Sequence, residues 1–295
     1  MTYDIRQVNA TMPKVAIIKG TDPVQQTVQA LEMIVSDVDA ALSQKKTILV
    51  KPNYLNSKAP STGITTDGRV VEGVVRFLKG KGHDVVIGEG SGFGETFNAF
   101  RVAGVDAVAE RYGVRLVDLN KDEFVEVYPP NALSLKKVKV AKTAVDSVIV
   151  SVPKLKLHRI AGVTLSLKNM MGALATKGVM HAGFSLSENI VDLASVLTPR
   201  LAVVDGIIAG EGHESSGNPV EMNLVIAGTD PVAVDSVGAA VMGVLPEDVK
   251  HLVLAEKKGL GTCQLDQITV VGEPIERVQR KFRRAIASRV LSFLG

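Results

Sequence analysis

Short apolar runs alternate along this chain with longer stretches in which apolar residues recur at helical spacing. The runs at 15–19, 47–50, 85–88 and 114–119 predict buried strands, and helical periodicity separates them. Strand, loop, helix and strand repeated in this order need crossover connections, which build a parallel sheet. The core must come from Val, Ile, Leu and Ala, because Trp is absent and aromatic residues are scarce. The predicted fold class is therefore α/β, with a mostly parallel sheet flanked by helices on both faces.

The remaining segments continue this pattern and interrupt it once. Near 122–145, two short alternating runs flank a Pro-Pro-Asn turn, which predicts a small antiparallel insertion. Further strands are expected at 148–152, 201–204, 224–227 and 268–271. Helices are expected at 28–42, 70–78, 99–112, 163–175, 190–197, 234–242 and 249–257.

The end of the chain has a different pattern from the rest. Residues 1–273 are predicted to form the α/β domain, as one unit or as two lobes divided near 145–160. In 274–295, basic residues interleave with apolar ones, and this predicts a basic amphipathic C-terminal helix. The simplest interpretation packs this helix on its own domain or on a second copy of the chain. Docking to a partner protein or to a membrane surface is the alternative.

Composition excludes several classes of function. The formal net charge is only +3, and aromatic residues for base stacking are few, so we do not expect nucleic-acid binding. The single cysteine, Cys263, excludes a self-contained iron–sulfur cluster and fits a reducing compartment. The N-terminal residues lack the apolar segment of a signal peptide, and no apolar run reaches the ~18 residues of a membrane span. We therefore expect a cytoplasmic protein without a transmembrane segment.

Polar and ionisable residues follow several of the predicted strands. In open parallel sheets, ligands bind beyond the carboxyl ends of the strands, so these residues are the candidates for a site. A small anionic molecule, such as a carboxylate or a phosphate, is the ligand that their charge favours. The expected substrate-binding residues are Lys51, Asn53, Gly90, Ser91, Lys154, Lys156 and Asn169.

The segment 153–159 carries the strongest candidates for catalysis. Alternation places Lys154, Lys156 and His158 on one face if the chain is extended. Clustered cations lower one another's pKa, which suits a general base or an imine-forming lysine. We expect His158 to be the general acid/base, and Lys168, a lone lysine in an apolar segment, to be an electrophile, an imine-former or a cofactor anchor. A solvated edge strand and a snorkelling lysine are the structural alternatives.

Two further patterns predict ligand contacts. The glycine-rich run 88–94 follows a strand, and its backbone N–H groups are candidates to hold an anion, or it is simply a tight turn. It matches neither a Walker A motif nor a clean dinucleotide fingerprint. His181, Asp205 and Glu211 are candidate ligands of a divalent metal, although no pair has a diagnostic spacing.

Five of these segments together resemble one protein family. The segments are Lys51-Pro52-Asn53, the Gly-Glu-Gly-Ser run at 88–91, 154–158, 167–172, and the Gly-Thr-Asp-Pro-Val-Ala-Val-Asp run at 228–235. In this order they are similar to the family called domain of unknown function 362, over residues 15–272. Members of that family often carry an appended ferredoxin-like module. This chain ends in the basic segment instead and lacks the cysteines, so an electron-transfer role of its own is not expected.

A more distant resemblance is to the catalytic subunit of lactate racemase, a nickel-pincer nucleotide enzyme. By this resemblance His158 matches a catalytic histidine, Lys168 the lysine that carries the cofactor, and His181 a nickel ligand. The racemase's Asp-His-Thr-Arg-Pro loop is replaced here by 51–53, and its second catalytic histidine by the glycine run. The resemblance therefore implies the architecture and the place of the site, while a nickel-pincer-like nucleotide or a divalent metal stays open as cofactor.

Two functions follow from these patterns. The first is an enzyme that binds a small anion or a nucleotide-like cofactor and uses lysine and histidine in acid–base chemistry, as an isomerase, a racemase-like enzyme or an oxidoreductase. The second is a non-catalytic accessory subunit of a redox or iron–sulfur system, docking through 274–295. Both depend on one spatial expectation, that the cations of 154–168 meet the glycine run 88–94 at the edge of a common sheet.

Overall fold

The computed structural model describes residues 12–44, 46–181 and 185–285 of the 295-residue chain. Its strands are β1 (Lys14–Lys19), β2 (Ile48–Pro52), β3 (Val85–Glu89), β4 (Arg115–Asp118), β5 (Phe124–Val127), β6 (Val138–Ala141), β7 (Val148–Val152), β8 (Lys154–His158), β9 (Gly162–Thr164), β10 (Leu201–Glu211), β11 (Asn218–Gly228) and β12 (Thr269–Gly272). Its α-helices are α1 (Pro23–Met33), α2 (Val35–Ala41), α3 (Gly68–Gly80), α4 (Thr96–Ala103), α5 (Val105–Tyr112), α6 (Lys142–Asp146), α7 (Ser166–Asn169), α8 (Leu186–Val196), α9 (Pro231–Val241), α10 (Lys250–Lys257) and α11 (Ile275–Val278).

Within these residues, ten strands form one sheet in the order β12-β1-β11-β10-β7-β2-β3-β4, and β8 and β9 extend it beside β10. The run from β10 through β7, β2 and β3 to β4 is parallel, whereas β11 pairs antiparallel with both β1 and β10. The mostly parallel α/β sheet is therefore confirmed. After β2 the chain forms β3 and β4 on one side of β2, and it later returns as β7 on the other side of β2. The boundary between β2 and β7 is therefore a switch point of the topology.

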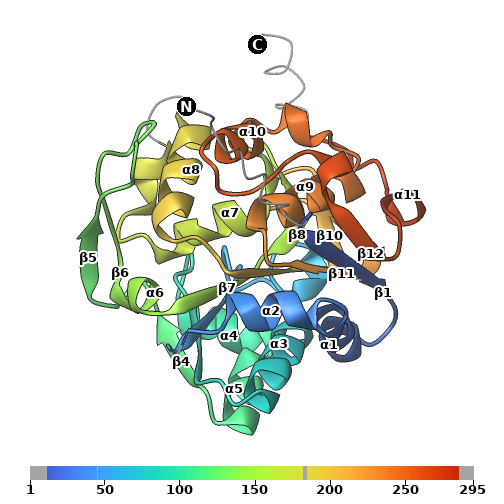
Figure 1. Cartoon of the computed structure of the whole chain (residues 1–295). Coiled ribbons are helices and arrows are strands. Elements are labelled where there is room, and N and C mark those ends of the chain that lie inside the picture. Colours follow the sequence, from blue (N-terminus) through green and yellow to red (C-terminus); the bar gives the residue numbers. More distant parts are fainter. Residues whose placement is uncertain (1–11, 45, 182–184, 286–295) are drawn as a thin grey trace, which may run out of the picture.

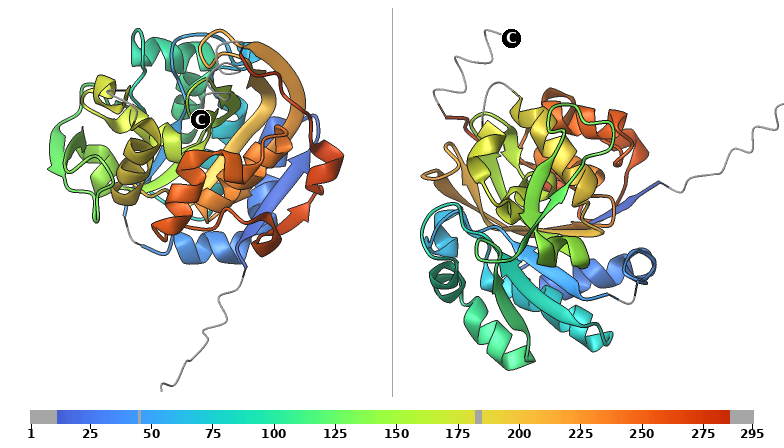
Figure 2. Two further views of the ribbon diagram at one scale, coloured as in Figure 1. Left: turned by 90° about the horizontal axis from the view of Figure 1, so that it is seen from above. Right: turned by 90° about the vertical axis from the view of Figure 1, so that its left-hand side faces the viewer.

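Helices cover both faces of the sheet (Figure 1). Helices α1 to α5 lie on one face and α7 to α10 on the other, and the second view in Figure 2 shows these layers on either side of the strands. The central strands contribute to both cores, because successive side chains point to opposite faces. In β2, for example, Ile48 and Val50 belong to one core and Leu49 to the other.

The predicted insertion is present as a separate two-stranded antiparallel hairpin of β5 and β6. Figure 2 shows it at the side of the molecule away from β12. It lies outside the main sheet and makes no contribution to the carboxyl ends of the parallel strands.

Three predicted helices are wrong in detail. The expected helix 28–42 is divided at Ile34, and the expected helix 99–112 is divided at Gly104, whose φ of 79° is left-handed. The segment 163–175 is not one helix but strand β9, the short α7 and a 3₁₀ turn at Met170–Ala173. Its apolar residues Val163, Leu165 and Leu167 recur every second position, which is the period of extended chain.

The predicted C-terminal helix is also wrong over part of its length. Helix α11 ends at Val278, and residues 279–285 are not helical. Phe282 is buried there, and Arg283 pairs with Glu211 of β10 at 2.6 Å. This ion pair holds the tail beside the end of β10. Residues 279–285 therefore do not form the helical hydrogen bonds that the basic and apolar periodicity predicts. The remainder of the predicted helix, 286–295, lies outside the described residues.

No helix in the described ranges combines the length and the apolar character needed to cross a lipid bilayer.

Candidate functional site

The carboxyl ends of β2, β3 and β8 surround a cavity of about 490 Å³. Of the predicted site residues, Asn53, Lys156, His158 and Lys168 line it, and so do Glu89 and Gly92 of the glycine run. Lys156, His158 and Lys168 therefore meet the glycine run 88–94, as expected, whereas Lys154 does not. The wall also contains residues outside the predicted set, which are Tyr54, Leu55, Phe93, Thr164, Met171, Lys177, Gly178, His213, Glu214 and Ser215.

Lys51 lies behind this cavity in a buried ion pair with Glu89. Its ammonium also donates to Asn169 Oδ1 at 3.1 Å and to Pro52 O at 3.3 Å. Gly172 makes this pair possible, because a Cβ at that position would overlap both the carboxylate and the ammonium. Lys51 thus has an acceptor for each of its three protons and does not line the cavity, so its predicted place in substrate binding is corrected, whereas its partner, Glu89, lines the cavity.

Asn169 connects the segment 167–172 with the segment 51–53 and with strand β7. Its Nδ2 donates to Lys51 O at 2.9 Å and to Ser151 Oγ at 3.1 Å, so its Oδ1 is the atom that accepts from Lys51 and from Asn53 Nδ2. The side chain is 2% exposed. Asn169 therefore holds the site together from behind and does not line the cavity.

Lys154 is separated from the other cations of its strand. Its ammonium pairs with Asp205 at 2.7 Å, and both side chains are fully buried. The Asp205 carboxylate also accepts from the backbone N–H of Asp67 at 2.6 Å and of Ile207 at 2.9 Å. Lys154 does not line the cavity, so its predicted place in substrate binding is corrected to a structural ion pair.

Lys156 and Lys168 are the predicted lysines that line the cavity. Lys156 donates to Ile64 O at 2.8 Å, whereas Lys168 has no hydrogen bond or ion pair among the described residues and is partly exposed. Burial, with the nearby charges of Lys168 and Lys154, lowers the pKa of Lys156 to about 7. Burial lowers the pKa of Lys168 to about 8. Both lysines therefore titrate close to neutral pH.

His158 is buried with its ring in a fixed orientation. Its Nδ1 accepts from the backbone N–H of Ile160 at 3.2 Å and of Ala161 at 3.0 Å, which places the proton of the neutral ring on Nε2. Nε2 lies 3.7 Å from Glu214 Oε1. Burial raises the pKa of Glu214, but hydrogen bonds from its own and Arg159's backbone N–H outweigh this effect and leave the pKa below its usual value. A histidine next to an ionised carboxylate is a common arrangement for proton transfer.

The glycine run contributes through its carboxylate rather than through its amides. Ser91 N–H donates to Thr96 Oγ1 at 3.2 Å, and a Cβ at Gly90 would overlap the backbone oxygen of Gly172. Neither residue lines the cavity. The predicted backbone cradle at Gly90 and Ser91 is therefore corrected, because Gly90 allows close packing against Gly172 and the Ser91 N–H already has an acceptor.

The predicted metal ligands do not come together. Asp205 is held by Lys154, and Glu211 by Arg283. The side chain of His181 lies outside the described part of the structure. Among the described residues, no three His, Cys, Asp or Glu side chains are grouped closely enough to hold a metal ion. The residues that the structure describes therefore do not fit a nickel or a divalent-metal site.

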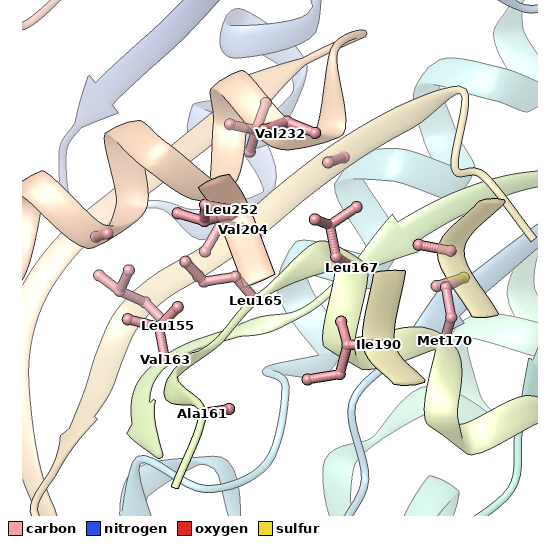
Figure 3. Packing of buried hydrophobic residues seen from close by; sticks show 14 of the residues in the cluster. Leu155, Ala161, Val163, Leu165, Leu167, Met170, Ile190, Val204, Val232 and Leu252 are labelled. Carbon is pink, nitrogen blue, oxygen red and sulfur yellow. The ribbon is translucent and has the colours of Figure 1, made fainter. Parts of the chain in front are cut away.

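Asp235 of α9 positions the segment that carries Lys168. Its carboxylate accepts from the backbone N–H of Ser166 at 2.7 Å and of Leu167 at 2.9 Å, at the start of α7. Figure 3 shows the apolar packing around this segment, in which Leu165 and Leu167 meet side chains of the neighbouring helices. Lys168 therefore projects from a rigid wall.

Replacement of Asp235 by alanine is expected to destabilise the protein by about 1–2 kcal/mol, because two buried N–H groups lose their acceptor. The melting temperature measures this loss. Asp230→Ala is the matched control, since Asp230 caps α9 through Val232 and Ala233 and does not contact α7. Only Asp235→Ala should also weaken ligand binding in the cavity. Equal binding by both variants would contradict a positioning role for Asp235.

Comparison with known proteins agrees with the sequence resemblance. The family model described as domain of unknown function (DUF362) matches residues 48–240, a range that contains every residue of the cavity wall. A relative in Synechocystis sp., named Thylakoid-associated protein sll1697, is 26% identical over 240 residues, which cover 78% of this chain and 74% of the relative. The chain therefore belongs to the family of the domain of unknown function (DUF362).

Proposed function

We propose that this protein is an enzyme that binds a small anion, a carboxylate or a phosphate, in the 490 Å³ cavity and acts on it by acid–base chemistry. The observation that carries the proposal is the convergence of Lys156, Lys168 and His158 on one enclosed wall. Lys156 and Lys168 would hold the anion, and His158 would transfer protons with Glu214 behind it. A nucleotide-like cofactor with an anionic group fits the same wall.

The charges of the cavity support an anionic ligand. Lys177 adds a third ammonium, whereas Glu89 is already paired with Lys51. Clustered lysines repel one another, and the charges of Lys168 and Lys154 add to burial, the main cause, in lowering the pKa of Lys156. A bound anion would relieve it and would favour the charged form of each amine.

Two buried polar atoms beside the cavity also support a ligand. Tyr54 OH and Asn53 Oδ1 have no hydrogen-bond partner within the described residues. Buried polar atoms are nearly always paired, so unpaired ones call for water or a ligand nearby. The reaction class that we favour is isomerase-like proton transfer, with a redox reaction as the alternative, and we place the protein in the cytoplasm because a single cysteine fits a reducing compartment.

Binding of sulfate and of oxalate, measured by calorimetry, tests the proposal. Lys156→Met and Lys168→Met are each expected to weaken binding by about tenfold or more, because each removes a charge-assisted contact. Affinity should fall as the pH rises through about 7 and about 8, since the two amines then lose their charge. Lys79→Met, at an exposed lysine of α3, is the control and should bind as the wild type does. A wild-type protein that binds neither anion at any pH would overturn the proposal.

A second candidate function is association with a membrane-bound partner, with no catalysis. The relative's name, Thylakoid-associated protein, favours it, together with the exposed basic residues Arg277, Arg280 and Lys281. Deletion of the tail would expose the core around Phe282, so replacement of these three residues by glutamine is the better test. If the triple variant no longer associates with anionic vesicles or membranes but still binds sulfate, this candidate is supported. If the variant associates with them as the wild type does, the candidate is excluded.

A further inference from the structure

Glu89 of β3 lines the cavity, and its partner Lys51 is buried behind it. Among the described residues, no other buried ion pair has this arrangement. Glu89 is 2% exposed, and its Oε2 accepts from Lys51. Its Oε1 makes no hydrogen bond within the described part of the chain. Lys51 has three acceptors for its three protons, so it has no reason to leave its position.

The surroundings of Glu89 favour a carboxyl group that exchanges protons. Burial raises the pKa of Glu89 to about 7, even though the charges of Lys51, Lys177 and Lys156 act in the opposite direction. An ionised Glu89 repels an anion that enters the cavity, whereas a protonated Glu89 can donate a hydrogen bond to it.

We propose that Glu89 takes up a proton from solvent when an anion binds in the cavity, and donates that proton in a hydrogen bond from Oε1 to the anion while Oε2 stays on Lys51. This inference rests on the proposed function, and it adds Glu89 as the ligand-contacting acid of the site. Glu89 comes from β3 and His158 from β8, with β2 between β3 and the β7–β8 segment. The ligand would therefore meet a proton-transfer group from each of two walls.

Other ionisable groups lie close to Glu89, so the test must separate them from it. Lys51 lies behind the cavity, and Lys156, Lys168, Lys177, His158, His213 and Glu214 line it. Glu214 offers a matched control, because it is a second carboxylate of the same wall whose pKa lies below its usual value. It stays ionised near neutral pH with and without an anion.

The experiment is calorimetry of sulfate binding in buffers of different ionisation enthalpy, which gives the number of protons taken up. Sulfate itself does not titrate near neutral pH. Glu89→Gln mimics the protonated carboxyl, so it should take up fewer protons and, at about pH 8, bind sulfate about tenfold more tightly than the wild type. Glu214→Gln removes a charge that raises the pKa of Lys156 and Lys168, so these amines are less protonated in the free variant, and its proton uptake should not fall below that of the wild type.

The outcomes separate the two proposals. A wild type that binds no sulfate overturns the proposed function. Sulfate binding with identical proton uptake and pH dependence in the wild type and in Glu89→Gln overturns the role of Glu89 alone. If Glu89→Gln does not fold, the infrared difference spectrum of the wild type decides: a new band of a protonated carboxyl group on addition of sulfate supports the inference, and its absence contradicts it.

Discussion

An Asp205→Asn variant is expected to lose about 3–5 kcal/mol of unfolding free energy, because it leaves the Lys154 ammonium buried without its counter-charge. For a chain of this size, that loss corresponds to a fall of roughly 10 °C in melting temperature. The asparagine keeps the shape of the side chain but has one acceptor oxygen where the carboxylate has two. The expected loss therefore combines the missing counter-charge with one backbone N–H, of Asp67 or of Ile207, that no longer has an acceptor. Denaturant unfolding measures the loss.

The double variant Lys154→Met/Asp205→Asn completes a thermodynamic cycle. Removal of both charges also removes the penalty of the unpaired ammonium, so the double variant should be more stable than Asp205→Asn alone. This result would show that the unpaired ammonium causes much of the loss in Asp205→Asn, as expected of a buried structural ion pair between β8 and β10. A double variant that is less stable than either single variant would contradict the assignment of Lys154 to structure.

The sheet could be predicted from the sequence because its signals are local. Apolar runs of four to six residues with polar ends give the parallel strands, and β2, β3 and β7 begin and end within two residues of the expected bounds. The divided helices could not be predicted with the same certainty, since the periodicity continues through Ile34 and Gly104. Only the backbone angles at those residues show the breaks.

The roles of the lysines could not be predicted, because they depend on contacts between residues that are distant in the sequence. Lys154 and Lys156 stand on the same face of one strand, and no local pattern distinguishes them. The register of β8 against β10 does, because it sets Lys154 opposite Asp205 and Lys156 opposite Gly210, with a bulge between the two positions. One lysine thus meets a carboxylate 51 residues away, and the other faces the cavity.

The same reasoning explains why Glu89 and Glu214 were not among the predicted site residues. Glu89 stands in the glycine run, whose glycines predicted a backbone contact to an anion, whereas the structure places Glu89 itself on the cavity wall. Glu214 follows β10 only because that strand continues to Glu211, seven residues beyond the predicted end. A search for single ionisable residues just after a strand would have found Glu89 and would still have missed Glu214.

Lys168 should react with carbonyl compounds far faster than an exposed lysine of ordinary pKa. An amine reacts in its neutral form, and a pKa of about 8 leaves roughly a tenth of Lys168 neutral at pH 7. For an ordinary lysine the neutral fraction is smaller by about two orders of magnitude. Lys168 is partly exposed to the cavity and unpaired among the described residues, so the amine is also accessible.

Glyoxylate with cyanoborohydride tests this expectation. The Lys168 nitrogen would add to the aldehyde carbon, water would leave to give an imine, and hydride from the reductant would convert the imine to a stable secondary amine. Peptide mass spectrometry at low reagent concentration should find the adduct mainly at Lys168, with about 100-fold less at exposed lysines such as Lys79. Lys156 should react less, because this residue is only 3% exposed and its amine donates a hydrogen bond to Ile64 O.

Two controls connect this reactivity with the cavity. Lys168→Arg keeps a cation but has no neutral amine near pH 7, so it should abolish the fast labelling and retain sulfate binding. Sulfate should protect Lys168 in the wild type, because a bound anion fills the cavity and favours the ammonium form. Labelling spread evenly over the surface lysines, or fast labelling of Lys168 that sulfate does not slow, would mean that the amine does not face the anion site, and the assignment of Lys168 to the ligand would then fail.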